Sequence, residues 1–298
     1  MSRYVAIDLA GLVPIDAVVL PDAEVIVAER KLLVLALITD PVLRAEVAAV
    51  LRLESEPLVK AIEAGALREL MVDQRINEAV RAVMLPTSRG GDLENLCSRL
   101  GVQRLIGETD DELRYRYQLA PEAFSTAGPY GAYEFHARSG HPLVKDAAIY
   151  GPESGLVEPG FVLAVILSKT GTGVPAREII DAVAAKFSPV DTRPLTDFVQ
   201  VSAATVTPYA INYHLHIRAG ADPSLIVTAA LNALQAYADA CHKVGRRVVV
   251  SALDGAAHQD RANVIRAIRV APLAEVNPGF EGAAFATSVG VTYEIVEG

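Results

Sequence analysis

Apolar residues recur at helical spacing through most of the first hundred positions. From Asp22 to Met84 this pattern is broken only at Asp40-Pro41 and at Glu56-Pro57. At each break, a residue that resembles a helix N-cap precedes a proline, and proline is well tolerated at the first helical position. We therefore predict three helices in this region.

The third of these helices is the longest, and it should end before Pro86. Its predicted apolar face consists of Leu58, Ile62, Leu67, Leu70, Met71, Ile76, Val80 and Val83. Its predicted polar face consists of Arg68, Glu69, Asp73, Gln74, Arg75, Asn77, Glu78 and Arg81. We expect Ile76 to be buried, either within the chain's own fold or against a partner. The polar face is either solvated, held by pairs three or four residues apart, or in contact with partner helices.

Further along the chain, the pattern changes from helix to strand. Helices are predicted at residues 92–100, 110–120, 129–140 and 175–187. Strands are predicted at residues 145–150, 161–168, 248–250, 264–270 and 288–296, with a strand pair at 197–204 and 207–218. Pro189, Asp191 and Pro194 mark the expected linker, and a helix of about six turns should run from Asp222-Pro223 to Gly245.

These elements predict an α+β protein with an N-terminal helical arm followed by two small α/β units with mixed or antiparallel sheets. The arm is placed at residues 1–105, the middle unit at 106–190 and the C-terminal unit at 191–298. In the C-terminal unit, we expect an open sheet with helices on one side.

Composition narrows the classes of partner. The 27 Lys and Arg against 36 Asp and Glu give a net charge of −9, which disfavours nucleic acid. The longest apolar runs are far shorter than the roughly 18–20 residues that span a bilayer, so we expect no membrane insertion. The residues after Met1 lack a signal-peptide pattern. Cys97 and Cys241 are expected to be buried free thiols. We therefore expect synthesis in the cytoplasm. The 51% hydrophobic content fits either an Ala-rich core or surfaces covered by neighbouring subunits.

Candidate chemistry is sparse. The segment Ser168 to Gly173 lies between a predicted strand and a predicted helix, where a phosphate-binding loop would stand, but its Lys-Thr-Gly order does not fit the Gly-Lys-Ser/Thr pattern. His214 and His216 share one face of a predicted strand, yet no third ligand of suitable spacing is evident, so we expect no metal there. No nucleophile motif surrounds a serine or either cysteine. We therefore predict no catalytic residue, cofactor or metal.

Several strings resemble, in order, those of the J-like baseplate family of contractile phage tails and R-type bacteriocins. The first half contributes Leu53-Glu54-Ser55-Glu56-Pro57-Leu58, Arg68-Glu69-Leu70, Arg75-Ile76-Asn77-Glu78-Ala79, Ala82-Val83-Met84-Leu85 and Gly91-Asp92-Leu93-Glu94. Further along are Ser125-Thr126-Ala127-Gly128-Pro129, Ala132-Tyr133, Phe135-His136-Ala137, Arg193-Pro194-Leu195-Thr196-Asp197 and Ala236-Tyr237. The resemblance covers nearly the whole chain.

The resemblance implies a structural wedge subunit located in the tail baseplate of a virion, tailocin or prophage. Its partners would be other copies of itself, a smaller wedge protein, and other baseplate and hub proteins. Together they would form the ring around the tail hub and rearrange when the sheath contracts. We expect the partner interface to include Leu58, Ile62, Leu70, Arg75, Ile76, Asn77, Glu78 and Val83, and the part from about Thr196 onward to mediate contact between copies.

Two other classes stay open on the residues alone. One is a cytoplasmic oligomeric α/β enzyme with a phosphate-binding loop near Gly171. The other is a soluble adaptor unrelated to phage tails. Nucleotide binding by the purified chain would favour the enzyme, and neighbouring genes for sheath and tube would favour the baseplate subunit.

Overall fold

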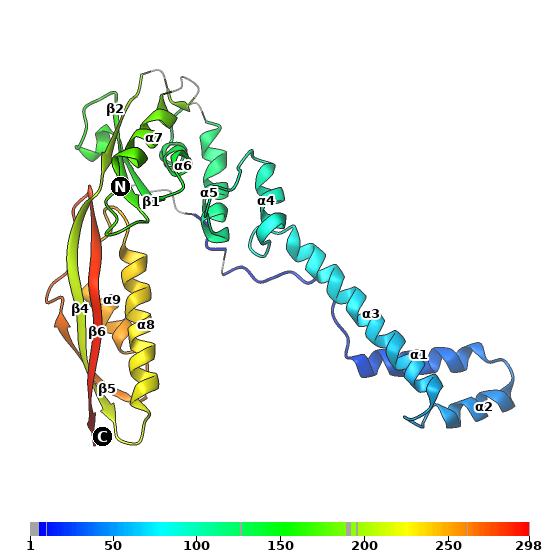
Figure 1. Cartoon of the computed structure of the whole chain (residues 1–298). Coiled ribbons are helices and arrows are strands. Elements are labelled where there is room, and N and C mark those ends of the chain that lie inside the picture. Colours follow the sequence, from blue (N-terminus) through cyan, green and yellow to red (C-terminus); the bar gives the residue numbers. More distant parts are fainter. Residues whose placement is uncertain are drawn as a thin grey trace. The chain divides into compact units, whose positions relative to one another are not determined.

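The computed structural model describes residues 6–9, 11–125, 127–188, 192–194, 196–260 and 262–297. Pro189 and Asp191 of the predicted linker, and Thr126 and Leu195 of the family strings, lie outside the described residues. The chain divides into two compact units: one is Ile7–Gln103, and the other continues from Arg104 and also includes Ala6. The predicted fold class is confirmed: helices precede two small sheets, and each sheet contains both parallel and antiparallel neighbours (Figure 1).

The first unit, residues 7–103, is helical throughout its regular structure. It contains α1 (Ala23–Leu37), α2 (Pro41–Val50), α3 (Pro57–Ala82) and α4 (Gly90–Ser98). Asp22 and Asp40 cap α1 and α2, since each side chain accepts a hydrogen bond from the backbone N–H two residues later. Pro41 and Pro57 occupy the first positions of α2 and α3. The three predicted helices are thus confirmed. Asp40 caps α2 as the sequence indicated, whereas the side chain of Glu56 makes no capping hydrogen bond and only Pro57 marks the start of α3.

One buried cluster of this unit lies where α1 and α2 meet the first half of α3, and Leu93 and Cys97 of α4 are buried as well. Leu51, Val59 and Ile62 are buried together, with Val27 and Val34 of α1 packed against them. Further along α3, the side chain of Asn77 replaces apolar packing by hydrogen bonds. Its Oδ1 accepts from the backbone N of Val18 at 2.9 Å, and its Nδ2 donates to the Val18 carbonyl at 2.8 Å. One amide side chain therefore holds the segment before α1 against the helix.

The second unit begins with a helix pair and a three-stranded sheet. Its first elements are α5 (Asp110–Ala123), α6 (Tyr130–Gly140), β1 (Val144–Tyr150), β2 (Phe161–Ser168), α7 (Arg177–Phe187) and β3 (Phe198–Ala203), with a short 3-10 turn, η1 (Pro152–Ser154), between β1 and β2. The strand order is β1-β2-β3, antiparallel and then parallel. Apolar residues of α6 and α7, including Ala137 and Val183, pack against the inner face of this sheet with Ala164 and Ile166 of β2.

The second sheet is covered by helices on one face, as predicted. It consists of β4 (Thr205–Arg218), β5 (Val264–Ala271) and β6 (Gly282–Val296) in the order β5-β4-β6, and α8 (Pro223–Cys241) and α9 (Val250–Ala257) pack on it (Figure 1). Alternate residues of β4, from Tyr209 to Ile217, are buried under these helices. Within the described residues, no helix or strand covers the other face of the sheet.

The predicted strand at residues 248–250 is wrong. Val248 forms a single antiparallel bridge with Val276, and the chain enters α9 at Val250. Val248 is apolar because it is buried in the core under the sheet, and the residues after it continue into a helix whose Leu253 and Ala257 are buried in the same core.

The predicted strand pair at 197–204 and 207–218 is also wrong in its pairing. β3 and β4 follow one another almost without interruption and belong to different sheets. The backbone N of Ala204 donates to Ile166 of β2, and that of Thr205 donates to Glu281 beside β6. The backbone therefore changes its strand-pairing partner from β2 to β6 between two consecutive residues. A boundary at residue 191 would separate β3 from β2, and the division of this unit into two parts stays a prediction.

A buried carboxylate connects the two sheets near the point where the chain passes from one to the other. Asp146 of β1 accepts a hydrogen bond at Oδ1 from Nη2 of Arg138 at 2.7 Å, and at Oδ2 from the backbone N of Val244 at 2.9 Å. Arg138 also pairs with Glu134 on its own helix at 2.9 Å. Val244 belongs in turn to an apolar cluster with Leu163, Val165 and Ala283, which joins the two sheets. Asp146 thus links α6, β1 and the segment after α8.

Asn77 generates a prediction about the first unit. Asn77→Ala should remove both hydrogen bonds to Val18 and lower the free energy of unfolding by about 1–2 kcal/mol, because each net hydrogen bond is worth about 1 kcal/mol. Limited proteolysis should then cut residues 11–20 faster than in the native chain. Gln74→Ala is the control, since it removes an exposed amide from the same helix. Equal cleavage rates for both variants would contradict the anchoring role.

Asp146 generates the second prediction. Asp146→Asn turns one of the two acceptor oxygens into an NH2 group that faces a donor, and leaves Arg138 with less compensation in a buried site. Breaking a buried pair in this way costs about 3–5 kcal/mol. Urea unfolding should show this loss. Asp181→Asn is the matched control because the Arg177–Asp181 pair is exposed, at 84% and 57% of the side chains, and should change stability by less than about 1 kcal/mol.

Candidate assembly surface and polar sites

Large apolar side chains are exposed along the helices of the first unit. They include Leu32, Leu33 and Leu37 of α1, Val42 and Leu43 of α2, and Leu58, Leu67, Met71, Val72 and Ile76 of α3, with Val83 just after it. Leu58, Val72, Ile76 and Val83 fall in one sector of the helix, because the intervals of 4, 7 and 18 residues between them return to nearly the same face. Among the described residues, no helix is long and apolar enough to cross a membrane.

The structure places the predicted interface residues in three different environments. Leu58, Arg75, Ile76, Glu78 and Val83 are exposed. Leu70 is half-buried, while Ile62 and Asn77 are buried by the chain itself.

Ile76 was predicted to be buried and Asn77 to lie on the polar face, but within this chain the structure shows the reverse. Ile76 is 40% exposed, so burial within the chain's own fold is wrong for this residue. Asn77, predicted on the polar face, is 4% exposed. The physical reason is that the packed face of α3 runs through Val59, Ile62, Ala66 and Asn77. At its far end the segment around Val18, which offers backbone hydrogen-bonding groups, lies against this face.

The charged residues of α3 pair mainly with distant parts of the same unit. Glu69 binds Arg30 of α1 at 2.6 Å, and Arg81 pairs with Asp16. Gly65 leaves room for the guanidinium of Arg30, which would have to shift if a side chain were added there. These pairs are partly exposed, so each contributes at most about 1 kcal/mol. They orient the helices and leave Arg75 and Glu78 on the surface.

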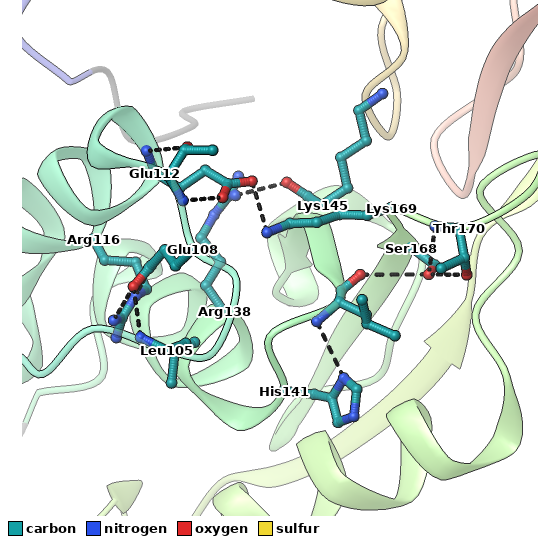
Figure 2. A network of polar contacts seen from close by, with 12 residues as sticks. Leu105, Glu108, Glu112, Arg116, Arg138, His141, Lys145, Ser168, Lys169 and Thr170 are labelled. Atoms are coloured by element: carbon teal, nitrogen blue, oxygen red, sulfur yellow. Dashed lines mark hydrogen bonds and ion pairs between the residues drawn. The ribbon is translucent and has the colours of Figure 1, made fainter.

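The loop after β2 is joined to α5 by an ion pair. Nζ of Lys169 lies 2.7 Å from Oε1 of Glu112, as Figure 2 shows. Burial works in the opposite direction, yet the hydrogen bond from Lys169 leaves the pKa of Glu112 below its ordinary value. The hydroxyls of Ser168 and Thr170 are 2.9 Å apart, and Gly171 forms an exposed turn with φ +60°. The lysine of this loop is therefore engaged with a carboxylate, and the arrangement gives no support to phosphate binding.

Arg116 and Glu108 form the most buried ion pair of this region. Nη2 of Arg116 donates to Oε2 of Glu108 at 2.8 Å, and both side chains are almost completely buried. The backbone N of Leu105 donates to the same carboxylate (Figure 2), and Nη1 of Arg116 also donates to the hydroxyl of Ser139 on α6 at 3.0 Å. The groups satisfy one another and hold α5, α6 and the segment before α5 together. Their role is structural.

Sequence reasoning missed one polar group on the open face of the second sheet. Glu294 of β6 lies beside His214 and His216 of β4. It was missed because 78 residues separate it from His216, and only the pairing of β4 with β6 brings them together. Cys97 and Cys241 are both buried as free thiols, as predicted.

The comparisons with known proteins agree with the resemblance read from the sequence. Residues 54–111 match the model of the Baseplate J-like N-terminal domain, and residues 125–203 match the model of the Baseplate J-like central domain. The central-domain match ends at Ala203, the last residue of β3, directly before the chain changes sheet.

A full-length relative supports the same assignment. The chain is 36% identical over 307 aligned positions to baseplate protein J of Escherichia phage P2, and the alignment covers 98% of each protein. The resemblance is therefore confirmed across the arm, both sheets and the helices that cover them. The chain belongs to the baseplate J-like family of phage tail baseplate proteins.

Proposed function

We propose that the chain is a structural subunit of the wedge in a contractile tail baseplate, and that it performs no catalysis. It would assemble with other copies of itself, a smaller wedge protein, and other baseplate and hub proteins into the ring around the tail hub. Assembly would take place in the bacterial cytoplasm, and the ring would take part in the trigger for sheath contraction. The relative from phage P2 is a baseplate protein, which supports the baseplate role.

The exposed apolar sector of α3 carries this proposal. Leu58, Val72, Ile76 and Val83 lie on one face, and further leucines are exposed on α1. Apolar patches of this kind on an otherwise folded surface mark interaction sites. A partner helix laid along the sector would bury these side chains and complete a bundle that the chain forms only in part. Arg75 and Glu78 lie beside it, where they can select a partner by charge.

The open sheets suit contact between copies. β6 is an edge strand of 15 residues with exposed Tyr293 and Ile295, and the face opposite α8 is free of any covering element in the described residues. We assign copy-to-copy contact to the part from Thr205 onward, because β3 belongs to the sheet of β1 and β2. A rearrangement on contraction needs interfaces with two stable arrangements, and separate surfaces for the partner and for copies would allow one to change without the other.

Ile76 provides the sharpest test. Ile76→Asp should leave the melting temperature of the isolated chain nearly unchanged, since the side chain is already in contact with water. It should abolish co-purification with the adjacent wedge subunit, because a charge would be buried without a partner. Ile62→Asp is the contrasting variant on the same helix, and it should unfold the first unit in isolation. If Ile76→Asp still assembles with native stoichiometry, measured by the mass of the complex, the α3 sector is not the interface.

The charged face of α3 yields a separate prediction. Arg75→Ala combined with Glu78→Ala should weaken binding of the wedge subunit while lowering the isolated chain's stability by less than about 1 kcal/mol. Binding should also fall with added salt in the native chain and less steeply in the double variant. Titration of the wedge partner at two ionic strengths measures both effects. Identical affinities for the native and double-variant chains would show that this face is only solvated.

A further inference from the structure

We propose that His214, His216 and Glu294 form a binding site for a divalent transition-metal ion such as Zn²⁺ on the open face of the second sheet. Within the residues that the structure describes, one donor atom from each of the three side chains lies within 4.8 Å of the other two. Two imidazoles and one carboxylate are a common protein ligand set for zinc, with a further position left for water.

Strand register places these groups on one face. Glu294 is the partner of His216 in the parallel β4–β6 pair, and Thr292 is the partner of His214. Residues two apart on a strand point to the same side of the sheet. Tyr213, Leu215 and Ile217 are buried under α8 and α9, so the two histidines point away from the core. The ligand set therefore follows from the alternation of β4 and from its pairing with β6.

The distances suit a single ion. Nε2 of His216 lies 3.1 Å from Oε1 of Glu294, and Nε2 of His214 lies 3.8 Å from Oε2. Donor atoms about 2.0–2.2 Å from a tetrahedral zinc are about 3.4 Å from one another. The two separations involve different oxygens of Glu294, and the three donor atoms lie within 4.8 Å of one another, so these partly exposed side chains must draw closer together to hold one ion.

A hydrogen bond prepares His214 for this role. The hydroxyl of Thr292 donates to the carbonyl of Tyr213 at 3.3 Å, and its oxygen lies 2.8 Å from Nδ1 of His214. When the hydroxyl proton lies on the carbonyl, the oxygen accepts from Nδ1–H, and the free lone pair of His214 is then on Nε2, the atom that faces Glu294. Such an outer hydrogen bond to a ligating histidine is a general feature of metal sites.

One charge opposes the ion. Arg266 of β5 stands opposite His216 in the antiparallel register, on the same face. Its side chain is exposed, so the guanidinium can extend into water away from the site. The carboxylate of Glu294 lies on the other side of His216 and supplies the compensating negative charge.

A bound ion would fix the end of the last strand. β6 is an edge strand that ends at Val296, and Glu294 is next to that end. Coordination by two residues of β4 and one of β6 adds a link between the strands where the backbone pairing stops. This would reduce opening of residues 292–296, because an ion that binds only the folded state stabilises it by mass action.

The test uses the full-length chain without a tag, stripped by a chelator and dialysed. Titration with ZnCl2 in a calorimeter should show saturable binding of one ion per chain. His216→Gln and Glu294→Gln should each weaken it by tenfold or more, and Thr292→Val by about tenfold or more through the loss of the outer hydrogen bond. His141→Gln is the control and should bind zinc like the native chain. His141 is far in sequence from the three ligands, and its Nδ1 accepts a hydrogen bond from the backbone N of Leu143.

Two results would overturn the site. One is the absence of saturable binding to the native chain, and the other is native affinity in both ligand variants. Melting curves without zinc should show that all variants fold, because none of the three ligands is in the core. Hydrogen exchange at residues 292–296 should slow on zinc addition in the native chain and not in Glu294→Gln. Zinc binding without that slowing would overturn the strand-fixing role.

Discussion

The change of sheet at Ala204 is the constraint on which the second unit depends. Residues 198–218 form an almost continuous extended segment, yet its first part pairs with β2 and its second part with β5 and β6. A strand cannot pass from one sheet to another unless the gap beside it is filled. Here Val244 and Ala283 pack against Leu163, Val165 and Leu167, while Asp146 hydrogen-bonds the backbone of Val244. Because the carboxylate also binds Arg138, the position of α6 is tied to the same point. The two sheets are thus mechanically coupled.

That coupling bears on the proposed role. The match to the central family domain ends at Ala203, so the partner change coincides with the limit of that domain. A subunit that passes a movement from one interface to another needs a rigid connection between them, and a continuous strand with a buried ionic link meets this need. Polar groups are suited to such a junction. Their hydrogen bonds are directional, and a shifted arrangement would leave buried charges unpaired, so intermediate positions are disfavoured.

Much of the fold could be predicted because its causes are local. Asp22, Asp40, Pro41 and Pro57 determine where helices begin, and each acts within its own turn. What could not be predicted depends on residues distant in sequence. Asn77 is buried because Val18 lies against it, and Glu294 meets His216 only through the β4–β6 register. The same holds for β3, whose proximity to β4 in the chain suggested a pair. Local patterns define elements, and pairing between them is decided by the whole core.

The first unit has few buried apolar residues and many exposed ones, which fits the structural role that the family resemblance implies better than it fits an enzyme. The buried cluster between α1, α2 and α3 is centred on Leu51, Val59 and Ile62, whereas many apolar side chains of similar size on these helices face water. A unit of about a hundred residues buries too little apolar area to be strongly stable when its helices remain partly uncovered. Its stability in an assembly would then include the free energy of association, which depends on the concentration of partners. Folding of the arm and growth of the assembly are coupled on this view. A surface that would be a liability in an isolated enzyme is the expected property of a subunit whose core is completed by its neighbours.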